Sequence, residues 1–499
     1  MTSSRIIVLV FLTSISLLTG VQSMAQKTKN KKGKTESSLA SYEKYIDDKM
    51  DAHLKEFVEF VSIPSISSIP SHRPDVVKAG EWIVNKLKAI GMTTAQLIPT
   101  EGNPVVYGSW DKAPGKPTVL IYAHYDVQPV DESEWENPPF APVIKDGKIV
   151  GRGASDDKGG IAIVIWALEA MLSKDGKLPV NVKLMFEGEE EIGSTNFKSF
   201  LSKNKEVFKA DFALNADDGQ YDDTTPGMTL SLRGAVPLEF TVKTADVAAH
   251  SGEFGGKTPN AALILSQIIS SFHDKAGNVA VEGFYDKVQP VTLQQKEMIK
   301  KLNYDPARDM KILGTTAEVG DTNYSPLERV WYRPTLEIVG MQSGYTAAEG
   351  HSNIIPASAM ARITFRLVSN QSAQEIVDLT VRHINKYCPA GATVSYKFSK
   401  GSASPVSLPV DTKAYRYIAD ALIKIYGKEP LQLASGGSVG SIIHIKEELG
   451  LLTYPLGFEL TDEKWHGANE FFRLSSVRKG QLIYCYYLQH LAEEESKRK

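Results

Sequence analysis

The sequence contains only two cysteines, Cys388 and Cys485, in 499 residues. Two cysteines are too few for a disulfide framework or for a zinc finger built on cysteine ligands. Neither cysteine has the histidine-and-asparagine context of a catalytic thiol. Whether the two thiols pair as a disulfide is left open by the sequence.

An excess of charge of one sign is also missing, since 56 basic residues face 59 acidic ones and the net charge is -3. A dedicated nucleic-acid-binding protein usually has a clear basic excess, so this class is disfavoured. The mean hydropathy of -0.20 excludes a polytopic membrane protein. Hydrophobic residues at 42% and charged residues at 23% are instead typical of a folded globular chain. At roughly 100–200 residues per domain, the length allows about two to four domains.

The N-terminal segment has the pattern of a secretory signal. Arg5 precedes an apolar run of 13 residues over 6–18, which is shorter than the roughly 20 residues that span a bilayer. Small residues before position 26 predict cleavage after Ala25. We therefore expect a signal peptide over 1–25 and a disordered, Lys-rich lead-in over 26–41. The mature protein is expected to be exported, periplasmic or secreted, without stable membrane insertion.

From about Tyr42, apolar residues at helical spacing alternate with short apolar strands. This alternation predicts an α/β fold with a mostly parallel sheet over 42–230 and again over 404–495. The intervening segment 231–403 has a different texture, which predicts an inserted α+β sandwich of one sheet and two helices. The expected strands are 119–123, 180–186, 212–215, 238–243, 360–367 and 393–398, and the expected helices are 45–60, 76–90, 161–172, 261–272, 374–387 and 415–426.

Acidic and histidine side chains gather in five segments, most of them directly after an expected strand. In open α/β sheets, ligands bind beyond the carboxyl ends of the strands, so we expect these segments to meet there. The segments are HYDVQP with His124 and Asp126, GRGASDDKGG with Asp156 and Asp157, FEGEEEIGS with Glu190 and Glu191, NADDG with Asp217 and Asp218, and KWHGANE with His466.

Histidine and carboxylate together suit zinc in open catalytic sites. Two histidines and several carboxylates suffice for two metals that share one carboxylate, which is a known hydrolytic arrangement. In an extended Glu190-Glu191 pair, neighbouring side chains point opposite ways, so one acid can bind metal while the other accepts a proton from water. Asp126 can hold the free ring nitrogen of His124. Each segment alone is compatible with an ordinary turn or an acidic loop; the combination is what indicates a metal site.

These motifs resemble the co-catalytic zinc exopeptidases that include aminoacylases, carboxypeptidase G and carnosine dipeptidases. The resemblance runs from about Tyr42 to Ala492 and is closest to the dipeptidase branch, through HYDVQP and SDDKGG. It implies an α/β catalytic domain interrupted by an inserted dimerisation and lid domain, a site for two zinc ions (with Mn or Co as alternatives), and a small peptide substrate. It also implies a homodimer formed through the inserted domain.

The resemblance also implies a role for each residue of the metal site. His124 and Asp217 match the ligands of one zinc, Asp156 the bridging carboxylate, and Glu191 and His466 the ligands of the other zinc. Glu190 matches the general base and Asp126 the acid that supports His124. Asp217 has the residue type typical of dipeptidases and aminopeptidases, where carboxypeptidases and acylases tend to carry Glu. The adjoining Asp218 is an alternative, although alignment of the preceding strand favours Asp217.

Further residues match the substrate-binding positions of the family. His250 in HSGEFGG matches a histidine that reaches into the partner's active site and polarises the scissile carbonyl. Arg366 matches an arginine that grips the substrate carboxylate, a task suited to its fork of donors; a structural ion pair is the alternative for it. The remaining substrate-binding candidates are Asn353, Ser435, Gly436 and Gly437.

The sequence therefore predicts an exported di-zinc exopeptidase for dipeptides or short peptides. The nearest alternative is the same chemistry on another amide, as an N-acyl amino acid amidohydrolase or a carboxypeptidase. A non-catalytic peptide-binding or metal-binding homologue is a second alternative, disfavoured because the base and all five ligands are present. A surface-interaction protein would have only the Lys-rich tail in its favour.

Overall fold

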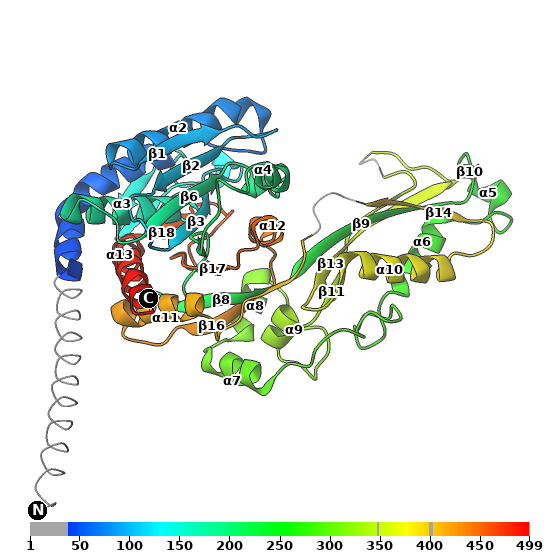
Figure 1. Cartoon of the computed structure of the whole chain (residues 1–499). Coiled ribbons are helices and arrows are strands. Elements are labelled where there is room, and N and C mark those ends of the chain that lie inside the picture. Colours follow the sequence, from blue (N-terminus) through cyan, green and yellow to red (C-terminus); the bar gives the residue numbers. More distant parts are fainter. Residues whose placement is uncertain (1–37, 347–348, 399–402, 499) are drawn as a thin grey trace, which may run out of the picture.

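The computed structural model describes residues 38–346, 349–398 and 403–498. The predicted signal peptide and residues 26–37 of the predicted lead-in lie outside these residues, whereas 38–41, predicted as disordered, form the start of a helix. Figure 1 shows two lobes, one around a six-stranded sheet and one around a long four-stranded sheet. Within the described part of the chain, no helix combines the length and apolar character needed to cross a bilayer.

The six-stranded sheet is mostly parallel, as the sequence predicts. The β6, β3, β7 and β17 strands run parallel; at one edge β2 pairs antiparallel with β6, and β1 pairs antiparallel with β2. The central β3 strand is an almost unbroken apolar run, which is typical of a strand buried on both faces. The order is β1 (Thr94–Ile98), β2 (Val105–Trp110), β6 (Asn181–Glu187), β3 (Thr118–His124), β7 (Phe212–Asn215) and β17 (Thr453–Pro455).

Helices cover both faces of this sheet. Ile121 of β3 belongs to one hydrophobic cluster, which includes Trp166 of the nearly wholly buried helix α3. Leu120 of the same strand belongs to a cluster on the opposite face, with Phe200. Successive strand residues point to opposite faces, so one strand supports both layers. The helices of this lobe are 38–61, α2 (Arg73–Ala89), α3 (Lys158–Asp175), α4 (Phe197–Lys203), α11 (Lys413–Tyr426), α12 (Gly440–Leu449) and α13 (Leu474–Ser496).

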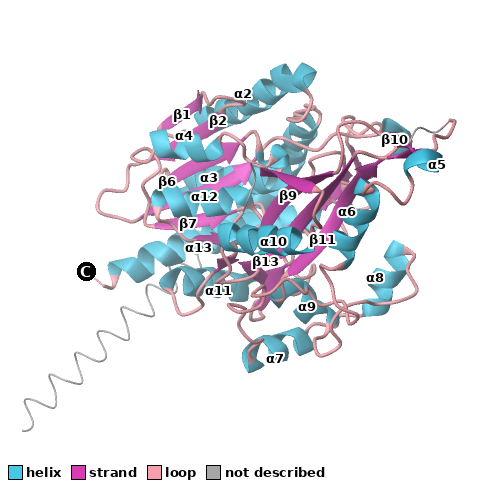
Figure 2. Cartoon of the chain, turned by 90° about the vertical axis from the view of Figure 1, so that its right-hand side faces the viewer, coloured by secondary structure: helices cyan, strands magenta, loops and turns pink. Residues whose placement is uncertain are grey.

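The four-stranded sheet is antiparallel and has its own hydrophobic core. Helices α6 (Ala261–Ser270) and α10 (Ala373–Tyr387) cover one of its faces (Figure 2). On the two edge strands, β11 and β14, the side chains of Val339, Met341 and Phe398 are more than half exposed. The strand order is β11 (Thr335–Ser343), β13 (Ser358–Leu367), β9 (Gly234–Lys243) and β14 (Thr393–Phe398).

The segment that joins the lobes contains three helices that the sequence analysis did not anticipate, so the expectation of two helices over 231–403 is incomplete. These helices are α7 (Leu293–Lys301), α8 (Pro306–Leu313) and α9 (Pro326–Tyr332), and they lie below the junction in Figure 1. Capping boxes at Thr292 and Ser325 mark two of their starts and were readable signals. A three-stranded sheet of β15 (Val406–Ser407), β8 (Gly227–Leu232) and β16 (Leu431–Ser435) lies beside them.

The remaining elements are short. They are the 3-10 helices η1 (Pro70–His72), η2 (Glu132–Glu134) and η3 (Glu190–Ile192), strands β4 (Val143–Lys145), β5 (Lys148–Val150), β10 (Ala249–His250), β12 (Ile354–Ile355) and β18 (Phe471–Arg473), and helix α5 (Ser251–Phe254). Both cysteines are free thiols, with Cys485 buried and Cys388 partly exposed. The pairing that the sequence left open is therefore absent from the structure.

Candidate metal centre

The residues of the predicted metal site come from the carboxyl ends of neighbouring parallel strands. Strand β3 ends at His124, β6 leads into the η3 turn with Glu190 and Glu191, and β7 is followed by Asp217. Parallel strands end at the same edge of a sheet, so these side chains meet there. The loop before α3 adds Asp156 to the same place.

Asp156 lies between the two histidines. Its Oδ1 atom is 2.9 Å from His124 Nε2, and its Oδ2 atom is 2.9 Å from His466 Nε2. Each oxygen of one carboxylate therefore faces a different imidazole. This is the arrangement that a carboxylate shared by two metal ions requires.

The other predicted ligands complete two groups around Asp156. Glu191 Oε2 lies 3.3 Å from His466 Nε2, and Asp156, Glu191 and His466 hold their ligand atoms within 4.8 Å of one another. On the other side, Asp217 Oδ1 lies 3.8 Å from His124 Nε2. Asp218 is not part of these groups, because its Oδ1 accepts hydrogen bonds from the Gly219 amide and Thr229.

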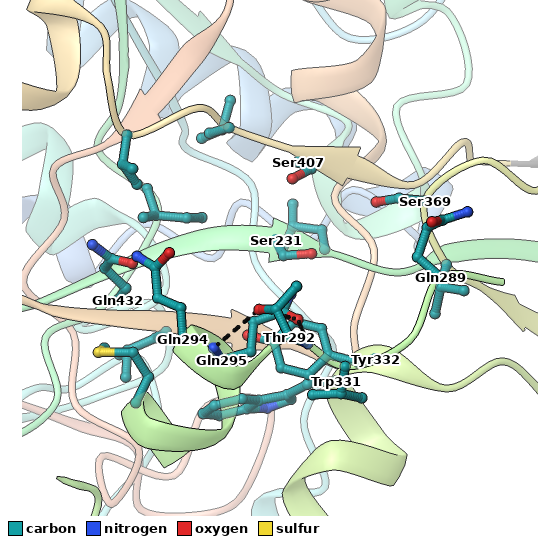
Figure 3. A pocket seen from close by; sticks show the side chains of 18 of the residues that line it. Ser231, Gln289, Thr292, Gln294, Gln295, Trp331, Tyr332, Ser369, Ser407 and Gln432 are labelled. Atoms are coloured by element: carbon teal, nitrogen blue, oxygen red, sulfur yellow. Dashed lines mark hydrogen bonds between the residues drawn. The ribbon is translucent and has the colours of Figure 1, made fainter. Parts of the chain in front are cut away.

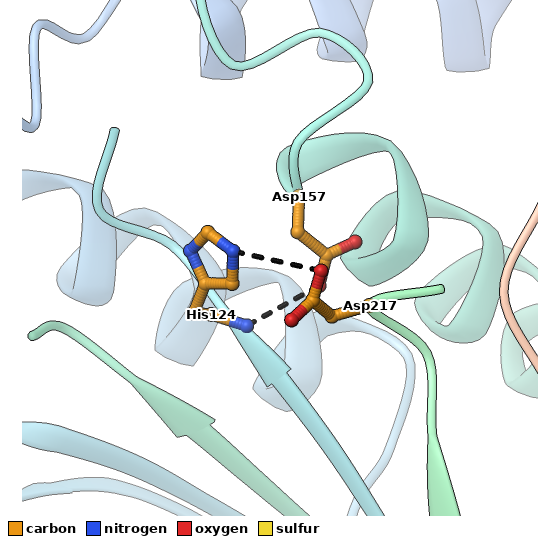
Figure 4. Close-up of side chains that lie close together, drawn as sticks. All are labelled: His124, Asp157 and Asp217. Carbon is orange, nitrogen blue, oxygen red and sulfur yellow. Dashed lines mark hydrogen bonds and ion pairs between the residues drawn. The ribbon is translucent and has the colours of Figure 1, made fainter. Parts of the chain in front are cut away.

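The group around His124 contains a carboxylate to which the sequence analysis gave no role. Asp157 lies beside His124 and Asp217, and the three hold ligand atoms within 4.8 Å (Figure 4). One oxygen of Asp157 accepts the backbone N–H of His124 at 3.3 Å. The other oxygen, Oδ1, is buried without a hydrogen-bond partner among the described residues. Because Asp156 contacts both imidazoles and Asp157 neither, Asp156 remains the better bridging candidate.

Asp126 holds the ligands in place. Its carboxylate lies 3.5 Å from His124 Nδ1 and accepts the backbone N–H groups of Glu190 and Glu191 at 3.2 and 3.1 Å. It therefore orients one ligand and the whole η3 turn together. Gln128, two residues further along, donates its side-chain N–H to Glu191 Oε2 at 2.7 Å.

The charges of the site perturb its titrating groups. Burial raises the pKa of Glu190 well above that of an ordinary glutamate, and the Asp217 carboxylate adds to this against the opposing effect of His124. Burial would also raise the pKa of Asp156, but the two histidines outweigh it and lower that pKa. Hydrogen bonds to Asp156 and Glu191 raise the pKa of His466 to about 10. Such perturbed acids and bases in one cleft are typical of a functional site.

A supporting carboxylate, Glu470, was overlooked in the sequence although it lies in the KWHGANE segment. It is fully buried and accepts the backbone N–H groups of Gly153, Ser155 and Asp156 at 3.0, 2.9 and 3.1 Å. Three amide donors fix the loop that presents Asp156. The signal available in the sequence was an acid four residues after a predicted ligand.

The metal-site residues open onto a large cavity. It has a volume of about 790 Å³ and is lined by Asp156, Asp217, Ser435 and Gly436, with residues of α8 across from them. A second cavity of about 350 Å³ lies between α7, α9 and the β8 sheet (Figure 3). Its lining contains serine, threonine and glutamine side chains but no histidine, cysteine or acid. The metal chemistry therefore belongs to the larger cavity.

The predicted carboxylate-binding residues lie next to that cavity. Arg366 donates from Nη1 to Ser438 Oγ at 3.1 Å, directly after the Ser435–Gly437 loop. Arg233, which the sequence analysis did not single out, donates to Gly436 O at 3.1 Å. Burial, together with repulsion from Arg366, lowers the pKa of Arg233 to about 10. Two neighbouring guanidinium groups form a place suited to an anion.

His250 and Asn353 are not brought to the metal site within one chain. His250 lies in β10, and Asn353 immediately precedes its partner strand β12. The Asn353 carbonyl accepts the N–H of Ser251 at 3.0 Å, so the two predicted residues are neighbours. Strand β10 lies at the end of the second lobe that is far from the six-stranded sheet (Figure 1).

The donor set fits a pair of divalent metal ions. Two imidazoles and several carboxylates are ligands of the kind that zinc and related metals take in catalytic sites. Oδ1 of Asp157 is buried without a hydrogen-bond partner among the described residues. A cation nearby would stabilise it, because burial of an unpaired carboxylate costs free energy. Both features are expected of a site built for cations.

Comparison with known proteins decides the family. The model of peptidase family M20/M25/M40 matches residues 120–490. The chain belongs to this family. With relatives described as dipeptidases and metallodipeptidases, the chain is a metallopeptidase and a hydrolase.

Relatives of the chain in this family match nearly its full length. The Cys-Gly metallodipeptidase dug1 of Schizosaccharomyces pombe is 28% identical over 475 residues, covering 91% of this chain and 98% of the relative. The cysteinylglycine-S-conjugate dipeptidase of Corynebacterium striatum is 30% identical over 388 residues, covering 77% and 83%. Among solved structures, the M20 family metallo-carboxypeptidase Sso-CP2 of Sulfolobus solfataricus has a TM-score of 0.78 at 30% identity, covering 88% and 99%. The predicted family and fold class are thus confirmed.

Proposed function

We propose that this protein is an exported di-zinc exopeptidase that hydrolyses dipeptides or short peptides. The observation that carries the proposal is the position of Asp156, with its two oxygens each 2.9 Å from a different histidine. The relatives from S. pombe and C. striatum, both described as dipeptidases, support the dipeptide class.

Five residues are proposed as ligands. His124 and Asp217 would hold one zinc, Glu191 and His466 the other, and Asp156 would bridge the two. When bound, the metals supply Lewis acidity, which lowers the pKa of water and polarises the scissile carbonyl. Asp126 keeps His124 and the η3 turn aligned, because it is bonded to both.

Glu190 is proposed as the general base. It belongs to none of the groups that bring ligand atoms together, although its neighbour Glu191 does. Its backbone N–H is fixed by Asp126, and its partly buried side chain lies beside the proposed ligand Glu191. Glu190 accepts a proton from the attacking water while the water oxygen bonds to the carbonyl carbon. It then returns the proton to the amine nitrogen as the C–N bond breaks.

The free carboxylate of the substrate is proposed to bind at the other end of the cavity. Arg366 supplies a fork of donors, and the Ser435–Gly437 loop supplies hydroxyl and amide donors beside it. Arg233 adds positive charge behind this loop. A site that needs a carboxylate close to the scissile bond favours short substrates.

A homodimer through the inserted segment 231–403 is proposed to complete the site. His250 and Asn353, in and beside the β10–β12 pair, lie far from the metal centre of their own chain. They can therefore contribute only to the metal centre of a partner chain. The edge strand β11, with Val339 and Met341 more than half exposed, offers apolar surface for such an interface. There, the imidazole of His250 would donate to the developing oxyanion.

Export is proposed from the N-terminal sequence alone. The run 6–18 and the small residues up to Ala25 have the signal-peptide pattern. N-terminal sequencing of the protein recovered from its native host tests this. A mature chain that begins at Gln26 is expected, and a chain that begins at Met1 contradicts it.

A substrate panel tests the activity. Chelator-treated protein is reloaded with zinc and given a free dipeptide, the same dipeptide with an amidated C-terminus, and an N-acetylated amino acid. Only the free dipeptide is expected to be cleaved. Cleavage of the N-acetylated substrate would move the protein to the acylase or carboxypeptidase class and overturn the dipeptidase proposal.

A further inference from the structure

Glu459 is an acid next to the metal centre for which the proposed mechanism has no use. Its backbone pairs with the turn that carries Asp217: the Gln220 N–H donates to Glu459 O at 2.9 Å, and the Glu459 N–H to Asp218 O at 3.3 Å. The approach is so close that a Cβ at Gly219 would lie 2.7 Å from Glu459 O. The glycine therefore permits Glu459 to lie against the ligand turn.

The side chain of Glu459 is turned toward two proposed ligands. Asp156, Asp217 and Glu459 each offer an oxygen, and these oxygens lie within 4.8 Å of one another. Glu459 also lines the 790 Å³ cavity that these ligands share. Only 6% of Glu459 is exposed, and its Oε1 atom is buried with no hydrogen-bond partner among the described residues.

The largest electrostatic effects on this carboxylate come from other acids. Asp156, Asp157, Asp217 and Asp218 all act on it. A buried acid without a hydrogen-bond partner or a counter-charge is strongly unfavourable. A cation bound among these oxygens removes that penalty. A purely structural role for Glu459 would leave one of its carboxylate oxygens without a hydrogen-bond partner.

We propose that Glu459 is a sixth protein ligand of the metal centre, on the side of His124 and Asp217, and that its oxygen raises the affinity of this position for Mn²⁺ more than for Zn²⁺. The inference rests on the proposed two-metal centre. Three carboxylates beside one imidazole form an oxygen-rich set, which suits Mn²⁺. Zinc is satisfied by fewer ligands and by a larger share of nitrogen.

The test compares the metal affinities of the wild-type protein and of Glu459→Gln, which keeps the size of the side chain. Metal-free protein is titrated with Mn²⁺ alone and with Zn²⁺ alone, and free metal is followed by electron paramagnetic resonance for Mn²⁺ and by a chromophoric chelator for Zn²⁺. We expect wild-type protein to bind two ions per chain. In Glu459→Gln, one of the two Mn²⁺ sites should weaken by about tenfold or more, and Zn²⁺ binding should change much less.

Asp218→Asn is the matched control. Asp218 is also an acid beside Asp217, but its Oδ1 is already hydrogen-bonded to Gly219 and Thr229. If both variants weaken Mn²⁺ binding equally, the effect is one of general charge and the proposed ligand role is wrong. Unchanged Mn²⁺ affinity in Glu459→Gln also overturns the ligand role of Glu459. If wild-type protein still binds two ions per chain in that case, the proposed two-metal centre is nevertheless supported. Fewer than two ions per wild-type chain would overturn the centre itself.

Thermal unfolding gives a second readout that does not depend on activity. Without metal, Glu459→Gln should melt at the wild-type temperature or higher, because it removes a buried acid that lacks a partner. With saturating Mn²⁺, the rise in melting temperature should be smaller in Glu459→Gln than in wild type, because the variant binds the ion less tightly. An equal rise would contradict the proposal.

Discussion

Arg152 and Glu470 form a buried ion pair, with Nη1 of the arginine 2.6 Å from Oε2 of the glutamate. Glu470 holds the loop of Asp156, and Arg152 donates from Nη2 to the carbonyl of His466 at 2.9 Å. The pair therefore connects the two segments that carry Asp156, the proposed bridging carboxylate, and His466, a proposed ligand. No metal contact is needed for this connection.

Breaking this pair should loosen both segments. Arg152→Ala leaves the Glu470 carboxylate buried without its counter-charge, so we expect a loss of about 3–5 kcal/mol in the free energy of unfolding. Urea denaturation of the metal-free protein measures it. Lys198→Ala, which breaks an exposed pair with Glu447, is the control and should lose less than about 1 kcal/mol. Equal losses in the two variants would show that the buried pair has no special role.

Glu190→Gln should abolish turnover while two metals stay bound. The amide cannot accept the proton of the attacking water, and general-base catalysis typically contributes about 10²- to 10⁴-fold. Initial rates on a free dipeptide, together with metal analysis of the same sample, check this. Glu206→Gln, at a largely exposed acid that pairs with Lys209, serves as control and should keep wild-type rates. A near-wild-type rate in Glu190→Gln would remove Glu190 from the mechanism.

Metal affinity should rise with pH between about 6 and 10. Hydrogen bonds to Asp156 and Glu191 raise the pKa of His466 to about 10, so its ring holds a proton in the metal-free protein at neutral pH. A ligating imidazole must be neutral, so protons compete with metal below that pKa and the competition fades as pH rises. Calorimetry at pH 7 in two buffers of different ionisation enthalpy should report proton release on metal binding.

The control for this titration is a histidine outside the centre. His466→Asn should release fewer protons than wild type, whereas His490→Asn, which changes a ring paired with Asp420, should release the wild-type number. Metal binding without proton release in the wild type would mean that His466 is not a ligand or is already neutral.

Mixing two inactive variants tests the proposed dimer. A dimer of one Glu190→Gln chain and one His250→Ala chain has one complete site, which combines Glu190 of the second chain with His250 of the first. Random pairing at equal amounts should restore about one quarter of the wild-type activity per chain. No recovery after confirmed subunit exchange would contradict a role for His250 across the interface.

That the proposed ligands lie close together was largely predictable from the sequence, because several of them follow strands. His124, Glu191 and Asp217 each lie a few residues beyond a buried apolar run, and parallel strands end at one edge. The same apolar runs predicted the sheet itself. The resemblance of the sequence motifs to those of the family then suggested Asp156 and His466, which come from loops rather than strand ends.

Other features depend on contacts between distant segments, which sequence patterns do not record. Glu459 reaches the centre only because its backbone pairs with Gly219, 240 positions earlier in the chain. Glu470 is buried by its pairing with Arg152. Helices α7 to α9 were missed because they are short, although two of them begin with capping boxes. The distance of His250 from the centre of its own chain also follows from how the lobes are arranged (Figure 1).

The most direct test of a hydrolytic two-metal centre is the rate of dipeptide hydrolysis as metal-free protein is titrated with zinc. The account predicts no turnover after chelation and a rate that reaches its maximum only at two zinc ions per chain. Full activity in the chelated protein, or no hydrolysis of any free dipeptide with two ions bound, would contradict it.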